Sequence, residues 1–190
     1  MALAGIRDIS VINSPPSDRL PIQTYVGGYN PDIIRQAIIR EIDRGGQVFF
    51  VHNRVQTIDA MATNLRHIVP EAKIGIAHGQ MQDRALEEVM RRFNSGEIDV
   101  LLSTSIIESG LDIPNANTLI VDRGDAFGLS QLYQLRGRVG RGSSRAYAYF
   151  FHHPKHHPTR EGLERLETIA ENTQLGSGYS IAMRDLEMRG

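Results

Sequence analysis

A cluster of arginines and glycines is the segment whose residue types point most directly to chemistry. Residues 134–141 (QLRGRVGR) place like charges close together, where they repel one another, and add glycines that weaken a helix by about 1 kcal/mol each. Because both features lower stability, we expect this segment to serve a function. We predict that Arg138 and Arg141, three positions apart, share one helical face and aim at the same anion. The alternative is an exposed turn whose arginines pair with nearby carboxylates.

A second polar segment follows an apolar run that ends at Leu102. Residues 103–114 (STSIIESGLDIP) carry hydroxyl groups directly after this predicted strand. In an open α/β sheet, ligands bind beyond the carboxyl ends of the strands. Thr104 and its serine neighbours could hydrogen-bond the phosphates of a nucleic acid without reading bases. Asp112 could accept from a ribose hydroxyl. The alternatives are a hydroxyl that caps a helix and an aspartate that forms a turn.

The elements that must position these residues follow from the periodicity of apolar residues. From Ile22 onward, runs of strand length alternate with segments of helical period, which predicts an α/β fold with a parallel sheet covered on both faces. The expected strands are 47–52, 73–78, 98–103, 118–122 and 146–151. The expected helices are 32–44, 57–69, 83–94 and 130–135.

The chain divides into three parts by composition. Residues 1–21 contain a cluster of breakers at 13–18 (NSPPSD) and are predicted to be a linker. Residues 22–151 form the main domain. Residues 152–190 contain helical stretches at 160–171 and 179–187, separated by Gly-Ser-Gly, and are predicted to begin a helical hairpin.

Composition excludes several classes of protein. The chain has 41% hydrophobic and 23% charged residues, which is ordinary for a globular domain, and no apolar run long enough for a membrane span. It contains no cysteine and lacks the apolar core of a signal peptide, so we predict a cytoplasmic protein. The net charge of -1 gives no indication of nucleic acid, although almost all of the positive charge is arginine, which suits phosphate recognition.

Four segments, taken in chain order, resemble the motifs of superfamily-two helicases. Residues 45–54 (GGQVFFVHNR) resemble motif four, residues 78–81 (HGQM) the motif after it, residues 103–114 motif five, and residues 134–141 motif six. The tail, through 165–170 (RLETIA) and 185–190 (DLEMRG), is similar to the translocation motif shared by the transcription-repair coupling factor and RecG families. The resemblance covers essentially the whole chain and implies a RecA-like helicase C-terminal domain of the P-loop NTPase type with a helical hairpin appended.

The resemblance implies a role for each matching residue. Arg138 and Arg141 look like arginine fingers that reach ATP held by a partner motor domain, and Gly110, Asp112 and Gln134 look like contacts around the nucleotide. Candidates for contacts along the DNA duplex are Asn53, Arg54, Gln80 and Thr104. The hairpin contains the basic residues expected to transmit movement, which are Arg165, Arg184 and Arg189.

The sequence lacks two parts of a complete ATPase. A P-loop needs Gly-x-x-x-x-Gly-Lys-Ser/Thr, and neither Lys73 nor Lys155 follows a glycine. There is also no adjacent Asp-Glu pair of the kind that holds magnesium in these motors. We therefore expect an excised piece of a larger protein that supplies one wall of an ATP site and cannot hydrolyse ATP alone. ATP and Mg²⁺ would be held mainly by the missing motor domain.

The implied activity is that of an ATP-dependent double-stranded DNA translocase that displaces stalled RNA polymerase in transcription-coupled repair. The implied partners are duplex DNA and the preceding RecA-like motor domain, with RNA polymerase and nucleotide-excision repair proteins bound through regions absent here, and no membrane. Two alternatives remain. A RecG-type translocase of branched DNA is disfavoured because residues 53–55 run straight into a helix and Gln80 stands where RecG-type sequences tend to have arginine. A non-catalytic DNA- or protein-binding module would not need arginines aimed at a phosphate.

Two smaller features have simple interpretations. The histidines of the segment 152–157 have spacings that could hold a metal, but the chain offers no thiolates and the neighbouring prolines indicate an exposed loop, so we predict no metal site. These histidines are His152, His153, His156 and His157. The aromatic residues of 147–151 are predicted to pack in the core rather than to stack on bases.

Overall fold

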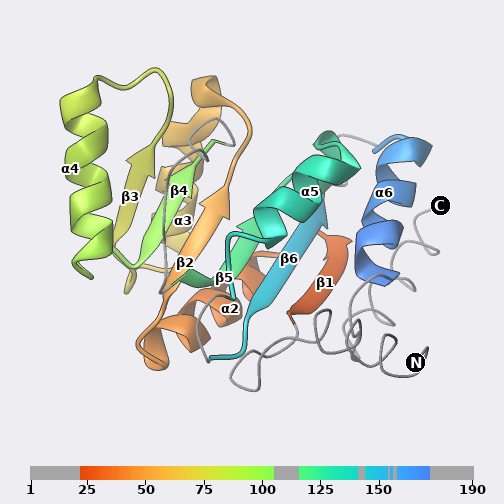
Figure 1. The fold of residues 1–190 in the computed structure, drawn as a ribbon, viewed down its shortest axis with the longest axis horizontal. Helices are drawn as coiled ribbons and strands as arrows, with labels where there is room; N and C mark the ends of the chain where they lie inside the picture. The colour runs from red at the N-terminus through yellow and green to blue at the C-terminus, as the bar shows by residue number, and fades with distance from the viewer. Residues whose placement is uncertain (1–21, 105–115, 141–143, 154, 156–157, 172–190) are drawn as a thin grey trace, which may run out of the picture.

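A computed structural model describes residues 22–104, 116–140, 144–153, 155 and 158–171, and shows a parallel β-sheet with helices on both faces (Figure 1). The strand order is β1-β6-β5-β2-β4-β3, and every neighbouring pair is parallel. The strands are β1 (Gln23–Gly28), β2 (Gln47–Val51), β3 (Ile74–Ala77), β4 (Val100–Ser103), β5 (Ala116–Val121) and β6 (Tyr147–His152). The helices are α2 (Pro31–Asp43), α3 (Ile58–Ile68), α4 (Asp83–Asn94), α5 (Leu129–Arg136) and α6 (Arg160–Glu171), with short 3₁₀ turns η1 (Val55–Thr57) and η3 (Gly124–Ala126).

The two faces of the sheet follow from the alternation of side chains along each strand. In β2, Phe49 and Val51 point to one face, where they pack with apolar residues of α4, α5 and α6. Val48 and Phe50 point to the other face and pack with α2 and α3. Figure 1 shows α5 crossing in front of the sheet and α6 beside β1, with α2 and α3 behind. The buried strands therefore read as continuous apolar runs, as expected of a sheet covered on both sides.

Local sequence explains where the helices begin and end. Asn30 caps α2, because its side-chain oxygen accepts hydrogen bonds from the backbone N–H groups of Asp32 (2.9 Å) and Ile33 (3.4 Å), and Pro31 occupies the first turn. Beyond the carboxyl ends of α2 and α4, Gly45 and Gly96 adopt φ angles of 80° and 87°, which strongly favour glycine.

The predicted α/β architecture is confirmed, and α4 and α6 have the predicted bounds. The strand β1 was not predicted as a separate element. Among the described strands it lies at the edge of the sheet beside β6, and its sequence ends in two glycines. Within the described residues, no helix combines the length and the apolar character that crossing a membrane requires.

The aromatic residues of β6 pack inside the protein, as predicted. Phe150 and Phe151 are fully buried on opposite faces of the sheet. Tyr147 lies under the guanidinium of Arg40, 3.6 Å from its ring centroid, and Tyr149 is half-buried beside Phe151. Phe150 packs with the core on the side of α5 and α6, whereas Tyr149 and Phe151 pack on the side of α2 and α3.

Candidate functional site

The parallel sheet brings four of the predicted DNA contacts to one edge of the domain. Asn53 and Arg54 follow β2, Gln80 follows β3, and Thr104 follows β4, and these three strands are neighbours in the order β2-β4-β3. Because all strands are parallel, their carboxyl ends meet at the same edge of the sheet. Asn53, Arg54 and Gln80 are exposed there, so the structure brings together side chains that are far apart in the sequence.

Thr104 is the buried member of that set. It is only 2% exposed, and its hydroxyl has no hydrogen-bond partner among the described residues; the hydroxyl of the preceding Ser103 is in the same situation. A contact between Thr104 and DNA stays a prediction, and it requires that this side chain first become accessible.

A chain of polar side chains at the same edge was not predicted from the sequence. His52 Nδ1 lies 2.6 Å from Asp122 Oδ2, and His52 Nε2 lies 2.6 Å from the hydroxyl of Thr57. The side chains of His52 and Asp122 are 12% and 5% exposed. Each follows one of two adjacent strands, β2 and β5, and that placement is the sequence signal that could have indicated the pair.

A tyrosine borders this polar chain. Tyr29 lies just beyond β1, and its hydroxyl accepts a hydrogen bond from the amide of Asn64 at 2.9 Å. Burial raises the pKa of Tyr29, the hydrogen bond from Asn64 lowers it, and the charge of Asp122 raises it further. The phenol is therefore held neutral beside the buried carboxylate.

The arginine-glycine cluster lies at the end of α5. The helix ends at Arg136, after which the N–H of Arg138 donates to the carbonyl of Leu135 (3.0 Å) and the N–H of Val139 to that of Arg136 (3.4 Å). Gly140 then adopts a φ of 82°. Arg138 is partly exposed in this turn.

The prediction of one helical face shared by Arg138 and Arg141 is therefore wrong. The helix ends at Arg136, before Arg138, with Gly137 as its C-cap residue, because glycine has low helical propensity. Arg141 lies outside the described residues, as do the predicted nucleotide contacts Gly110 and Asp112.

Helix α5 exposes one of the predicted site residues, and its last residue binds helix α6. Gln134 is exposed, whereas Leu132 and Leu135 are fully buried against the sheet. Arg136 is half-buried and donates to the carbonyl of Ile169 in the last turn of α6, at 3.3 Å. Burial lowers the pKa of Arg136, and its guanidinium lies 4.9 Å from the ring centroid of Tyr133.

The first helix of the predicted hairpin is docked on the main domain through Arg165. Its guanidinium donates to the backbone carbonyls of Phe127 (2.9 Å) and Asp125 (3.0 Å). Gly162 lets α6 approach closely, since a Cβ there would stand 3.0 Å from the carbonyl oxygen of Asp125. Arg184 and Arg189 lie outside the described residues.

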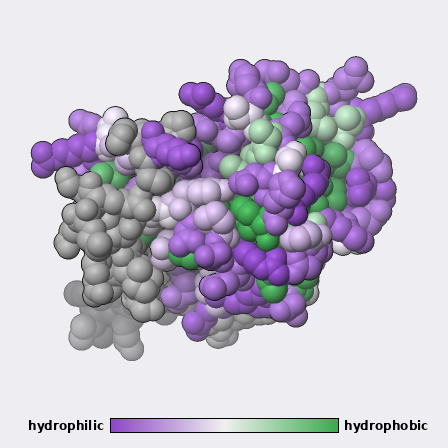
Figure 2. Space-filling view, turned by 180° about the vertical axis from the view of Figure 1, so that it is seen from behind, coloured by the Kyte–Doolittle hydropathy of each residue, from purple (hydrophilic) through white to green (hydrophobic). Residues whose placement is uncertain are grey.

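A hollow on the described surface lies along α2. It has a volume of about 700 Å³ and is lined by one face of α2 between Asp32 and Arg44. Two of its arginines contact other parts of the fold: Arg35 pairs with Glu71 at 2.5 Å, and Arg44 donates to the carbonyl of Arg145 at 2.6 Å. Figure 2, which views the molecule from behind, shows small hydrophobic patches separated by hydrophilic residues.

The histidine segment contains one buried and one partly buried residue. His152 is 1% exposed at the end of β6, and His153 packs against Tyr29, with their ring centroids 5.3 Å apart. His156 and His157 lie outside the described residues. In the described part of the chain, no three histidine, aspartate or glutamate side chains gather closely enough to hold a metal ion.

Comparison with known proteins identifies the family. The model of the helicase conserved C-terminal domain matches residues 30–143, which include the carboxyl edge and the arginine-glycine cluster. The chain belongs to this family. Among solved structures, RecG bound to a three-way DNA junction superposes with a TM-score of 0.70 at 34% identity, over 91% of this chain and 23% of that one. The C-terminal domain of the DEAD-box protein Dbp5 has a TM-score of 0.58 at 17% identity, over 82% of this chain and 86% of that one, and shows the same fold.

Relatives at higher identity are transcription-repair-coupling factors. The chain is 54% identical over its full 190 residues to the coupling factors of Staphylococcus haemolyticus and Mycobacterium tuberculosis. It spans 16% and 15% of the length of these relatives. The predicted resemblance to this group and the RecA-like helicase fold are both confirmed, and identity to the coupling factors exceeds identity to the RecG structure.

Proposed function

We propose that this helicase C-terminal domain is the second motor domain of an ATP-dependent double-stranded DNA translocase. In the whole protein it acts in transcription-coupled repair by displacing stalled RNA polymerase. The observation that carries the proposal is the 54% identity to transcription-repair-coupling factors over the entire chain. The polymerase and the nucleotide-excision repair proteins are bound through other regions of that protein, and the site of action is the cytoplasm.

The domain supplies one side of an ATP site. The sequence has no P-loop, so the preceding RecA-like domain holds ATP and Mg²⁺, and the chain alone does not hydrolyse ATP. Arg138 and Arg141 reach the γ-phosphate from this side, where a guanidinium stabilises the charge that develops during transfer. Gly110, Asp112 and Gln134 contribute contacts around the nucleotide. The exposed Gly137 leaves room for close approach of the triphosphate to the backbone, whereas Gly140 packs against Ala146.

The proposed DNA contacts lie along the carboxyl edge of the sheet. Asn53, Arg54, Gln80 and, once accessible, Thr104 bind backbone phosphates and do not read bases. Binding of this kind weakens as the salt concentration rises, because it releases counterions condensed on the phosphates and this release is less favourable at higher salt.

The docking of α6 supports a coupling role for the hairpin. Arg136 connects the end of α5, next to Arg138, with the last turn of α6, and Arg165 fixes α6 to the residues that precede α5. A shift of Arg138 toward nucleotide would therefore carry α6 with it. We assign Arg184 and Arg189 to the same coupling element.

The test compares ATP turnover by the whole protein with that of its Arg138→Ala and Arg141→Ala variants. Turnover should fall on the order of 10³-fold or more, while affinity for duplex DNA is retained. Arg145→Ala is the matched control, because Arg145 is an exposed arginine of the same segment and should tolerate truncation. Normal turnover with both Arg138 and Arg141 truncated would exclude the proposed mechanism.

A second candidate function is remodelling of branched DNA. It is favoured by the TM-score of 0.70 to RecG bound to a three-way junction. Turnover stimulated by a three-way junction far more than by linear duplex would favour this function over the first. Retention of DNA binding without any DNA-stimulated turnover would instead indicate a non-catalytic binding module.

A further inference from the structure

The hydroxyl of Thr57 bonds a histidine and not the helix that Thr57 precedes. Thr57 is the N-cap residue of α3, a position where a threonine hydroxyl normally accepts a hydrogen bond from the first turn of the helix. Its side chain makes no such bond. Its hydroxyl lies instead 2.6 Å from Nε2 of His52, five residues earlier in the chain.

His52 is fixed on its other side by a buried carboxylate. An ionised carboxylate can only accept, so Nδ1 carries a proton and donates to Asp122 at 2.6 Å. Nε2 accepts from the Thr57 hydroxyl in the neutral imidazole and donates to it in the charged form. The backbone N–H of His52 also donates to the carbonyl of Ser103 at 2.9 Å, which holds the residue in the sheet.

Two of the four residues between His52 and Thr57 are proposed DNA contacts. Asn53 and Arg54 are exposed, and their side chains form no hydrogen bond or ion pair with another described residue. The direction in which they point therefore depends on how the loop is held at His52 and at Thr57. A loop held in its bound conformation before the ligand arrives loses less conformational freedom on binding.

We propose that Asp122, His52 and Thr57 form a positioning bridge that orients Asn53 and Arg54 toward the DNA backbone. The inference rests on the proposed function, since it assumes that these two residues contact phosphates. The bridge connects the end of β5, the end of β2 and the start of α3, so it fixes the loop to the rigid part of the domain. The three bridge residues do not themselves touch the DNA.

The test measures DNA-stimulated ATP turnover of the whole protein as a function of linear duplex concentration. Thr57→Val removes the hydroxyl with little change of shape and should raise the half-saturating DNA concentration about fivefold, as expected for the net loss of one hydrogen bond. Turnover at saturating DNA should stay within about twofold of wild type, because the ATP site is not altered. Thr57→Ser restores the hydroxyl and should restore the wild-type value.

The control is Thr63→Val on the same helix. The hydroxyl of Thr63 bonds only the carbonyl of Asp59, at 3.2 Å, within α3, so this variant should behave as wild type. His52→Asn keeps a donor for Asp122 but is too short to reach Thr57, and it should reproduce the Thr57→Val shift. The double variant should shift no further, because both changes break the same bridge.

Three outcomes distinguish a failure of this inference from a failure of the proposed function. If wild type shows DNA-stimulated turnover and Thr57→Val matches Thr63→Val, the bridge does not position the loop. A melting temperature lowered in Thr57→Val without a change in half-saturating DNA would also overturn the inference, since it indicates a purely structural role. If wild type shows no DNA-stimulated turnover at all, the proposed function fails and the inference falls with it.

Discussion

The anchoring of α6 by Arg165 gives a prediction whose size can be worked out from the structure. The Arg165→Ala substitution removes two hydrogen bonds from a guanidinium to the carbonyls of Phe127 and Asp125. Hydrogen bonds to charged groups contribute about 1.5–3 kcal/mol each. Because Arg165 is only partly buried, water replaces part of the loss, and we expect a net cost of about 2–3 kcal/mol in the free energy of unfolding.

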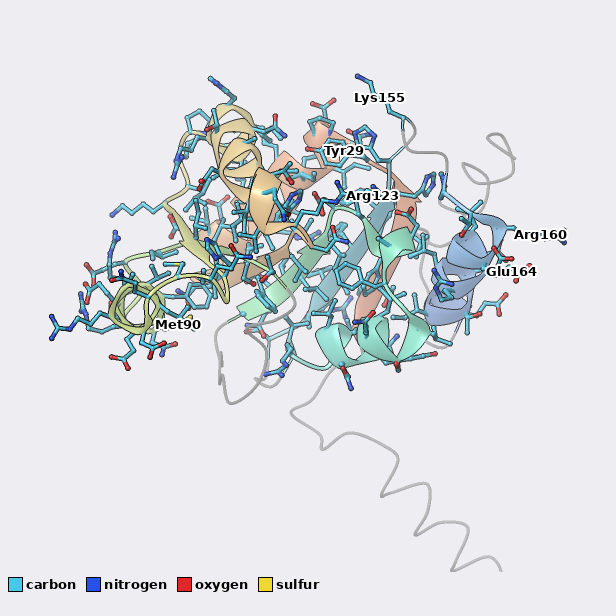
Figure 3. The ribbon with its side chains drawn as sticks, turned by 90° about the horizontal axis from the view of Figure 1, so that it is seen from above. Tyr29, Met90, Arg123, Lys155, Arg160 and Glu164 are labelled. Atoms are coloured by element: carbon cyan, nitrogen blue, oxygen red, sulfur yellow. The ribbon has the colours of Figure 1, made fainter. Side chains whose placement is uncertain are left out.

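The matched control is Arg160→Ala on the same helix. Figure 3 shows Arg160 and Glu164 on the outer side of α6, and their ion pair of 3.3 Å joins side chains that are 90% and 60% exposed. A pair this exposed contributes little, so we expect less than about 0.5 kcal/mol. In a domain of this size 1 kcal/mol corresponds to about 2–4 °C, so Arg165→Ala should lower the melting temperature by about 5–10 °C and Arg160→Ala by about 1–2 °C.

The assay is thermal unfolding of the purified chain followed by circular dichroism, with hydrogen exchange of the α6 amides as a second measurement. If α6 undocks before the rest unfolds, those amides should exchange roughly 30–100-fold faster in Arg165→Ala at an unchanged melting temperature. The reasoning is refuted if Arg165→Ala matches Arg160→Ala in both measurements.

Two further predictions concern stability. The bidentate contact with Arg35 holds the pKa of Glu71 at about 2, so the stabilisation is present above the ordinary carboxyl pKa and is lost as the pH falls toward 2. The difference in melting temperature between wild type and Glu71→Gln should therefore be constant from pH 7 to about 5 and shrink below it; a difference unchanged down to pH 2 would contradict this. Gly96→Ala should lower the free energy of unfolding by about 1 kcal/mol, because Gly96 has a positive φ. Gly140→Ala should lower it by more, because Gly140 also has a positive φ and a Cβ added there would stand 3.0 Å from Ala146 Cβ, whereas Gly96 is not crowded. Chemical denaturation of the two variants measures this difference, and equal costs would show that the contact relaxes freely.

The helices were predictable where local sequence decides their bounds. In α4 the apolar period, Asp83 in the first turn and Gly96 after the last turn all indicate the same element. The edge strand β1 was missed because its place depends on pairing with β6, which no local pattern reveals. The error at α5 has the opposite cause, since the spacing of the arginines was interpreted as helical although the helix ends at Arg136, next to Gly137.

The candidate site was predictable in its outline but not in its contacts. A polar residue after a buried strand of a parallel sheet lies at the carboxyl edge whatever the strand order, which is why Thr104 could be placed there from the sequence, whereas Asn53, Arg54 and Gln80 were predicted from the resemblance to helicase motifs. The contact of His52 with Asp122 requires that β2 and β5 be neighbours in a register that pairs Val51 with Val121. Register is a property of the assembled sheet, so the bridge became visible only in the structure.

The pairing of β1 with β6 has a consequence for biosynthesis. Gln23 pairs with Tyr147, so the first described strand leaves the ribosome long before β6, its neighbour in the described sheet, exists. At about 5–20 residues per second, the wait lasts on the order of ten seconds. During that time the nascent β1 has both edges open to other strands, a state that favours mispairing.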